Sequence, residues 1–289
     1  MRREILAAPL LAALAAASGC TTARAHYAAD RAQHGHDFAG SPPVILWAWQ
    51  RPNDLSFINP RSTGVSFLVE TIRFGAGGMA VDRNSNSLRV PAGTWLMACA
   101  RIEMPPGFVP TPSRDKAVAS LVARLGRFPG AKAVQIDFDA TVSQRAFYHS
   151  LLTELRLRLP ASMPLSITAL ASWCEGDDWI SALPVDEAVP MLFRMGADGR
   201  SILFRLQSGG DFAEPLCRKS EGISTDEFAP RLPSARRVYV FNPEGWTKAS
   251  SAEFPVFGNS PAVPSSGKKA AELKNNSALL AVPPAGKKW

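Results

Sequence analysis

The sequence predicts an α/β protein: an irregular (β/α)8 barrel of the TIM type, with short or missing helices and disordered termini. Three observations predict it. Eight short apolar runs have strand character, leucine-rich helical segments separate several of them, and the chain of 289 residues is long enough for one large domain. Near-continuous apolar strands that alternate with helices are typical of parallel βα units. Eight such units close into a barrel.

The expected strands share a composition typical of strands buried on both faces, and the run at 221–225 is the weakest of them. They span residues 44–49, 64–72, 96–103, 133–139, 164–170, 188–194, 221–225 and 237–242.

Helices are expected in three of the connections. Residues 113–128, with Ser113 as a possible N-cap, and residues 143–159, which start with Ser143, are convincing. Residues 198–208 form a moderate third. Residues 73–95 carry Gly, Asn and Pro and predict a hairpin or loop in place of a helix, which makes the barrel irregular.

The N-terminus has the pattern of an export signal. Two arginines precede an apolar stretch that is too short for a comfortable membrane span. The stretch ends at "ASGC", and small residues before Cys20 resemble a bacterial lipoprotein signal, in which that cysteine is lipidated. Ordinary cleavage after Ala25 is the alternative. The first route predicts a lipoprotein on the periplasmic face of the envelope, and the second a free periplasmic or secreted protein.

Four segments follow from this organisation. Residues 1–20 are the expected signal peptide, 21–42 a disordered tether, 43–257 the barrel and 258–289 a basic disordered tail. The net charge is +7, but the tail holds five of the lysines and only one acid. A nucleic-acid binder carries its charge on a folded face. The sequence therefore does not favour nucleic-acid binding.

The cysteines of the mature chain predict one disulfide. An oxidising compartment permits the bond. Cys174 and Cys217 lie in polar, loop-like surroundings, whereas Cys99 lies in an apolar run and is the expected free thiol. Three buried thiols are the alternative.

The run "VQIDFDA" (134–140) places two carboxylates on one face of an expected buried strand. Alternate side chains of a strand point to opposite faces. Asp137 and Asp139 would therefore point toward the barrel axis, with Asp139 at the C-terminal mouth. A buried carboxylate needs a partner, and Arg101 on the preceding strand can supply one if its face is inward. The alternative is a polar core network without a ligand site.

The same run resembles a known glycosidase motif. With the helical segment after it, "AVQIDFDA" resembles the fourth strand and helix of chitinase-type barrels, whose motif is Asp-x-x-Asp-x-Asp-x-Glu, with the glutamate as general acid. Alignment on Asp137 and Asp139 places Val134 at the first aspartate and Thr141 at the glutamate, so the general acid of that motif is missing.

A wider set of segments resembles one family. "ILWAWQRPNDLSF", "QIDFDA", "LSITALASWC", "LPVDEAVPMLFRMG" and "GISTDE" together are similar to bacterial domain-of-unknown-function family 3142, of exported glycosidase-like barrels. The resemblance implies fold and location and brings no assigned reaction.

Residues that follow strands supply candidate ligand contacts. Trp49, Trp173 and Trp246 would rim the mouth, where flat aromatic faces suit sugar rings; strand-end tryptophans that cap the core are the alternative. Arg194 is a further inward candidate at the mouth.

Two acids end the weak seventh strand. Asp226 and Glu227 would either supply the absent acid or cap a helix.

The chain offers little for other chemistries. Three of the four histidines lie in 21–42, which leaves His149 on an expected helix. His-dependent hydrolysis and a His-rich zinc site are not favoured, and no metal or cofactor is expected.

We therefore expect an exported, monomeric, glycosidase-like barrel that acts on a carbohydrate or envelope polysaccharide and meets the membrane only through a lipid anchor. Asp139 would be acid/base or substrate anchor, and Asp137 would orient it. The alternative is a non-catalytic glycan- or envelope-binding lipoprotein, which the missing glutamate favours.

Overall fold

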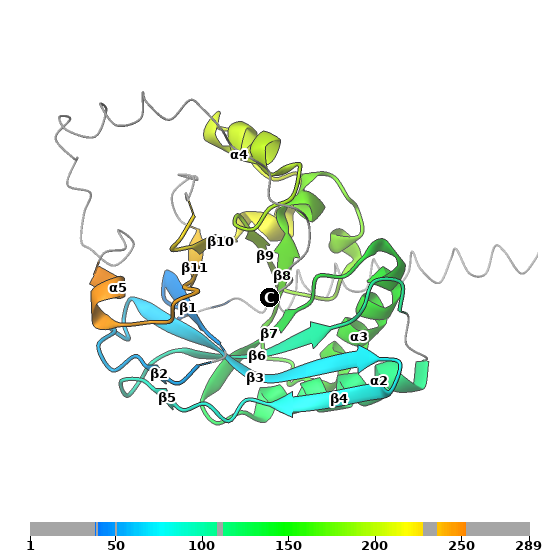
Figure 1. Ribbon diagram of the computed structural model, residues 1–289, viewed down its shortest axis with the longest axis horizontal. Coiled ribbons are helices and arrows are strands. Elements are labelled where there is room, and N and C mark those ends of the chain that lie inside the picture. Colours follow the sequence, from blue (N-terminus) through cyan, green and yellow to red (C-terminus); the bar gives the residue numbers. More distant parts are fainter. Residues whose placement is uncertain (1–37, 39, 50, 109–111, 228–235, 253–289) are drawn as a thin grey trace, which may run out of the picture.

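Eight parallel strands form a closed barrel in the computed structural model, which describes residues 38, 40–49, 51–108, 112–227 and 236–252 (Figure 1). Each barrel strand is hydrogen-bonded to the barrel strands that precede and follow it in the chain. The sheet closes because β1, the first strand, pairs with both β3 and the last strand, β11. The predicted fold class is confirmed. The barrel strands are β1 Val44–Ala48, β3 Thr63–Gly75, β6 Leu96–Glu103, β7 Ala131–Asp137, β8 Leu165–Leu170, β9 Glu187–Met191, β10 Ser220–Ser224 and β11 Arg237–Phe241.

The helices outside the barrel are few and short, as expected for an irregular barrel. Figure 1 shows α2 and α3 along one side of the barrel and α4 well away from them. The α-helices are α2 Pro112–Val122, α3 Arg145–Arg158, α4 Gly199–Gln207 and α5 Lys248–Ala252. The 3₁₀ turns are η1 Ala123–Arg127, η2 Val142–Gln144, η3 Ala171–Glu175, η4 Ile180–Ala182 and η5 Pro215–Arg218.

A hairpin replaces the helix in the connection between β3 and β6, as the Gly, Asn and Pro residues of 73–95 predict. Strand β4 (Gly78–Arg83) turns back and pairs antiparallel with β3. Two short strands, β2 (Asn53–Asp54) and β5 (Leu88–Arg89), pair beside it. The weak run at 221–225 is a full barrel strand, β10, and its five residues are all buried.

The helical starts differ slightly from the expectation. Ser113 lies inside α2, which begins at Pro112, and the segment after β7 begins at Val142 with the turn η2, one residue before the expected start. Thr141 caps the preceding turn η2 in a reciprocal capping box with Gln144, and the Thr141 N–H donates to Gln144 Oε1 at 2.9 Å. The helical segment begins earlier because the box satisfies its first free N–H groups. Thr141, the residue at the position of the absent glutamate, therefore has a structural role here.

The outer core packs the helices on the strands. Val134, Ile136 and Phe138 of the β7 segment are buried in one cluster with the apolar stripe of α3. Phe138 meets Phe147 and Tyr148 edge to face, with ring centroids 6.1 and 5.1 Å apart. These three positions therefore face the helix layer, as the alternation predicts.

The inside of the barrel holds a continuous polar network below the mouth. Glu187, fully buried, accepts hydrogen bonds from Ser166 at 3.0 Å and Tyr239 at 2.7 Å. Gln135 extends this hydrogen-bond network. Its side-chain amide donates to Ser166 and accepts from the Ser66 hydroxyl and from the Trp47 indole N–H, the last at 2.8 Å. Since buried polar groups are costly unless paired, this network closes the base of the barrel and makes it rigid.

The described part of the N-terminal segment packs on the barrel. Phe38 lies within the expected tether 21–42 yet is only 6% exposed. Its ring centroid is 6.2 Å from that of Trp95, and the Arg237 guanidinium lies 4.5 Å from its ring. The packed structure therefore begins before residue 43.

The predictions for the export signal and the basic tail fall on residues that the structure does not describe. These residues include Cys20, Ala25 and the tail 258–289. Within the described ranges, no helix combines the length and apolar character that a membrane crossing requires.

Candidate functional site

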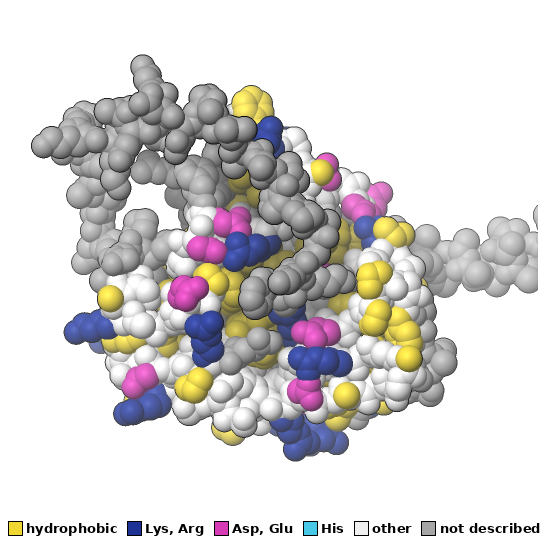
Figure 2. Space-filling model, in the orientation of Figure 1, with side chains coloured by type: hydrophobic (Ala, Val, Ile, Leu, Met, Phe, Trp, Pro, Cys, Tyr) yellow, Lys and Arg dark blue, Asp and Glu magenta, His cyan; other side chains and the backbone are white. Residues whose placement is uncertain are grey.

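A cavity of about 500 Å³ opens at the C-terminal mouth of the barrel. Its wall joins the ends of β1, β6 and β11 to the segments that follow β9 and β10. It is lined by Trp47, Trp49, Arg51, Asn53, Arg101, Glu103, Arg194, Asp226, Phe241, Asn242, Pro243, Glu244, Gly245 and Trp246. The volume falls in the range of ligand pockets, about 300–1,000 Å³. Acidic and basic side chains lie intermingled on the face drawn in Figure 2, rather than in a patch of one sign.

Asp137 lies just below this mouth and is 7% exposed. The Thr168 hydroxyl donates to its Oδ1 at 2.7 Å, and Arg101 Nε lies 3.7 Å from its Oδ2. Burial raises the pKa of Asp137 to about 6. The negative charge of Asp139 adds to the rise, whereas Arg101 and Thr168 oppose it. A carboxyl group with this pKa exchanges its proton near neutral pH.

Asp139 lies two residues past the end of β7, and its side chain is exposed. Burial of the carboxyl group by the surrounding barrel wall raises its pKa, although the charge of Arg101 opposes the rise. The side chain thus reaches solvent while the protein around it still disfavours the charged form. Neither aspartate is among the residues that line the cavity, but Asp139 is the one of the two whose side chain is exposed to solvent.

Arg101 connects the parts of the site. Its Nε lies 3.7 Å from Asp137 and 3.2 Å from Glu103, and its guanidinium lies 5.3 Å from the Trp49 ring. The predicted pairing of Arg101 with Asp137 is confirmed. Glu103 also accepts a hydrogen bond from Arg73 at 2.7 Å.

The three candidate tryptophans have different surroundings. Trp49 lines the cavity and meets Phe241 edge to face, with centroids 5.9 Å apart. Trp246 also lines it but is 7% exposed, and its indole N–H donates to the Trp47 carbonyl at 2.9 Å.

Trp173 does not line the cavity. It is 5% exposed and packs in the outer core against Trp179, with ring centroids 4.9 Å apart. The turn η3 directs the side chain onto the outside of the barrel, so being next to a strand end does not place it at the mouth.

Arg194, Asp226 and Glu227 form a second cluster. The Arg194 guanidinium donates to Asp226 at 2.8 Å and to Glu227 at 2.5 Å, and its backbone N–H also reaches the Glu227 carboxylate. Arg194 has a φ of 52°, the only positive φ among the described residues other than glycine. Arg194 and Asp226 line the cavity, whereas Glu227 lines an open hollow beside α4.

The surroundings of Asp226 favour its charged form. Burial alone would raise its pKa, but hydrogen bonds from Ser224 and Arg194 hold the pKa below its ordinary value. This carboxylate therefore suits the anchoring of Arg194 better than the donation of a proton.

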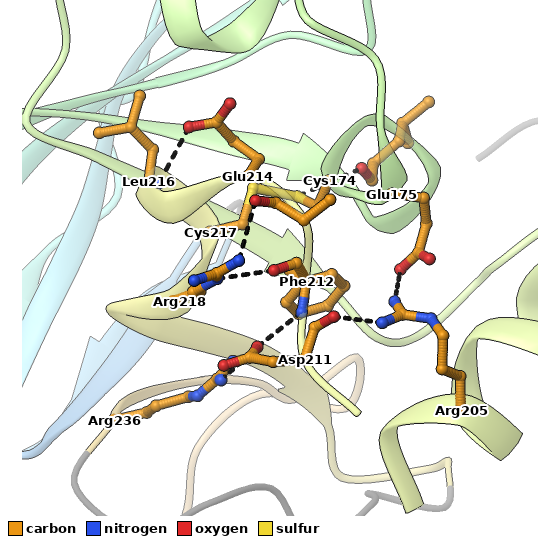
Figure 3. The surroundings of a disulfide bond; sticks show 12 residues. Cys174, Glu175, Arg205, Asp211, Phe212, Glu214, Leu216, Cys217, Arg218 and Arg236 are labelled. Atoms are coloured by element: carbon orange, nitrogen blue, oxygen red, sulfur yellow. Dashed lines mark hydrogen bonds and ion pairs between the residues drawn. A yellow bond between two sulfur atoms is a disulfide. The ribbon is translucent and has the colours of Figure 1, made fainter. Parts of the chain in front are cut away.

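The structure joins Cys174 to Cys217, with a Cα–Cα distance of 6.0 Å, and leaves Cys99 buried as a free thiol. The bond links η3, after β8, to η5, before β10. Figure 3 shows charged pairs around it, Arg205 with Glu175 and Arg236 with Asp211. The disulfide thus fixes the outer connections that lead into β9 and β10.

Sequence reasoning did not select Glu103 as a site residue, although its signal was present. Glu103 follows Arg101 by two positions and so shares its inward face. Arg51 and Glu244, which also line the cavity, lie in loops, and Asn53 lies in the two-residue strand β2, so none of the three carries a periodic signal. Among the described residues, no group of three or more His, Cys, Asp or Glu side chains could hold a metal ion.

Comparisons with known proteins give a family and two distant structures. A family model described as domain of unknown function (DUF3142) matches residues 78–244. A crystal structure provisionally assigned as chitinase A from Streptomyces coelicolor is 13% identical, with a TM-score of 0.46, over 69% of this chain and 91% of that one. An endo-β-N-acetylglucosaminidase from Cordyceps militaris in apo form is 8% identical, with a TM-score of 0.41, over 78% and 85%. No curated protein matches the sequence.

Proposed function

The chain belongs to the DUF3142 family, and we propose that it is an exported, glycosidase-like enzyme that acts on a carbohydrate at the mouth of its barrel. One observation carries the proposal. Asp137 and Asp139 lie at and just past the C-terminal end of β7, Arg101 of the cavity wall lies 3.7 Å from Asp137, and burial raises the pKa of both aspartates. Barrel enzymes place their chemistry at this end of the strands.

The two carboxyl groups divide the work between them. Asp139, which is exposed, is the acid/base that exchanges a proton with the glycosidic oxygen. Asp137 lies behind it, fixed by Thr168 and Arg101. Because two nearby carboxylates resist simultaneous ionisation, the pair retains a proton at a pH where an isolated aspartate has lost its own.

The cavity wall suits a sugar. Trp49 and Phe241 offer apolar ring surfaces, and the side chains of Arg51, Asn53 and Asp226 offer hydrogen bonds around them. A wall that is partly aromatic and partly polar matches the apolar faces and hydroxyl edges of a pyranose ring. The cavity volume of about 500 Å³ leaves room for a short oligosaccharide segment.

A non-catalytic glycan- or envelope-binding protein is the second candidate. The position of the glutamate in chitinase-type motifs is taken by Thr141, whose backbone and side chain are engaged in the capping box. If no other carboxylate serves the reaction, the same mouth would only bind its glycan.

Turnover of labelled glycans by the wild type and Asp139→Asn separates the two candidates. The probes are fluorescent fragments of chitin, of peptidoglycan glycan strands and of neutral β-glucan. We expect the wild type to release product from at least one of them. In Asp139→Asn the rate should fall by about 10²- to 10⁴-fold, because the amide cannot exchange a proton.

Binding of the same fragments completes this test. For an enzyme, Asp139→Asn keeps most of its affinity, since the amide preserves shape and hydrogen-bonding reach. A wild type that binds a fragment without cleaving it, and loses affinity in Asp139→Asn, identifies the binding protein instead. A wild type that neither binds nor cleaves any fragment contradicts both candidates.

The export route belongs to the same proposal. The "ASGC" pattern supports lipidation of Cys20, which would anchor a monomeric barrel to the periplasmic face of the envelope. Mass spectrometry of the mature N-terminus tests it. We expect a diacylglyceryl-modified Cys20, whereas a free His26 N-terminus would show cleavage after Ala25.

A further inference from the structure

We propose that Glu103 is the second catalytic carboxylate, the nucleophile of a retaining glycoside hydrolase in which Asp139 is the acid/base. The inference rests on the proposed function and deepens it, because the aspartates of β7 alone leave the second chemical role unassigned.

The strand register places Glu103 and Asp139 each two residues beyond a paired position. Strands β6 and β7 are parallel neighbours, and Arg101 pairs with Asp137. Two residues further along each chain lie Glu103, which lines the cavity, and Asp139, just past the last residue of β7. Since neighbouring strands lie about 4.8 Å apart, carboxyl groups carried at this level can approach the separation of about 5–5.5 Å that retaining glycosidases use.

The contacts of Arg101 show that Glu103 also lies near Asp137, the aspartate below Asp139. Its Nε lies 3.2 Å from Glu103 Oε1 and 3.7 Å from Asp137 Oδ2. These two carboxylate oxygens are thus both first neighbours of one nitrogen atom. Glu103 therefore faces the aspartate pair, not the outside of the barrel.

Glu103 is placed to meet a ligand. It lines the cavity beside Trp49, and its side chain is 35% exposed. Arg73 and Arg101 hold its carboxylate at 2.7 and 3.2 Å. Two guanidinium groups balance its charge and fix its direction, as a nucleophile that waits in one orientation requires.

The reaction balances with these two groups and water. Glu103 attacks the anomeric carbon and forms an ester bond to it, while the bond to the leaving oxygen breaks and Asp139 gives that oxygen its proton. Asp139, now a carboxylate, then takes a proton from water, whose oxygen displaces Glu103 from the anomeric carbon. One water is consumed, one glycosidic bond is cleaved, and the anomeric configuration is retained.

Glu103→Gln tests the nucleophile, with Glu154→Gln as a matched control. Glu154 pairs with Arg158 at 2.8 Å on the outer helix α3, and its side chain is 29% exposed, similar to Glu103. On the fragment that the wild type cleaves, we expect Glu103→Gln to lose at least about 10²-fold in kcat. Glu154→Gln should stay within about threefold of the wild type.

Two further readouts separate a nucleophile from a residue that merely supports the fold. Proton NMR of the first product should show the anomeric configuration of the substrate. Azide added to Glu103→Ala should restore turnover and yield a glycosyl azide of inverted configuration, because the small anion takes the place of the missing carboxylate. Thermal unfolding of each variant identifies any loss that comes from misfolding, and the azide rescue remains interpretable in a destabilised protein.

The outcomes distinguish this inference from the proposed function. If the wild type cleaves a fragment but Glu103→Gln is equally active, or the product has the inverted configuration, Glu103 is not the nucleophile. The proposed enzymatic function would still stand. A wild type that cleaves no fragment overturns both. Loss in Glu103→Gln that azide does not restore in Glu103→Ala also counts against a nucleophile.

Discussion

Two arginine–carboxylate clusters at the mouth differ mainly in burial. Arg101 lies among Glu103 and the buried Asp137, and there burial raises the pKa of the aspartate to about 6. Arg194 lies with Asp226 and Glu227 at the exposed rim, where hydrogen bonds hold the pKa of Asp226 below its ordinary value. The same residue types therefore supply a proton-exchanging group in one cluster and a fixed ion pair in the other.

Removing each arginine is the strongest test of this contrast. Arg101→Gln leaves Asp137 and Glu103 facing each other without their shared cation, which should lower the free energy of unfolding at neutral pH by about 3–5 kcal/mol. Arg194→Gln breaks exposed pairs and should cost only about 0–1 kcal/mol. Urea unfolding of both variants measures the difference. Equal losses would show that burial does not separate the clusters.

The pH dependence of stability gives a second, smaller contrast. The folded-state pKa of Asp137 lies above its unfolded value of 3.8. Its contribution to stability is therefore complete below about pH 4 and is lost as the pH rises through about 6. Relative to Asp137→Asn, the wild type should lose roughly 1–3 kcal/mol across this window.

Asp226 provides the opposite sign. Its folded-state pKa is lowered, so its contribution is present above the unfolded value and is lost only as the pH falls through the folded value. The stability difference between the wild type and Asp226→Asn should thus be flat from about pH 5 to pH 7. Urea unfolding at several pH values compares the two variants, and parallel curves for both would contradict the assignment.

The contrast also shows which parts of the site the sequence can predict. Strand alternation predicted the inward face of Asp137 and Asp139 and the pairing with Arg101, because the period of two holds wherever a strand is buried on both sides. The same period placed Glu103 inward, whereas the chitinase-type motif places its glutamate at the position that Thr141 occupies in this chain. Alternation along the strand therefore indicated the inward position of Glu103, whereas similarity to the chitinase-type motif did not.

Features outside the strands were less predictable. Trp173 follows a strand as Trp49 does, yet η3 directs it into the outer core. The positive φ of Arg194 is a property of a loop held by Asp226 and Glu227, and no local pattern encodes it. Phe38 lies in a polar, aperiodic segment, and only the barrel surface around Trp95 gives it a place to pack. Each depends on tertiary contacts that a single sequence does not display.

The smallest expected difference between the two clusters is in how salt changes the coupling energy of each arginine–aspartate pair. Raising the ionic strength from about 0.1 M to about 1 M shortens the Debye length from about 10 Å to about 3 Å, and exposed charges are screened far more than buried ones. Double-mutant cycles measure the coupling of each arginine to its aspartate, with Gln replacing the arginine and Asn the aspartate. For Arg194 and Asp226, side chains that are 55% and 40% exposed, we expect the coupling to fall toward zero in high salt. For Arg101 and Asp137, 27% and 9% exposed, most of the coupling should remain, because water and ions do not reach the space between them. A buried coupling that disappears with salt would mean that the Arg101 cluster is solvated at its base, and the raised pKa of Asp137 would then lose its physical cause.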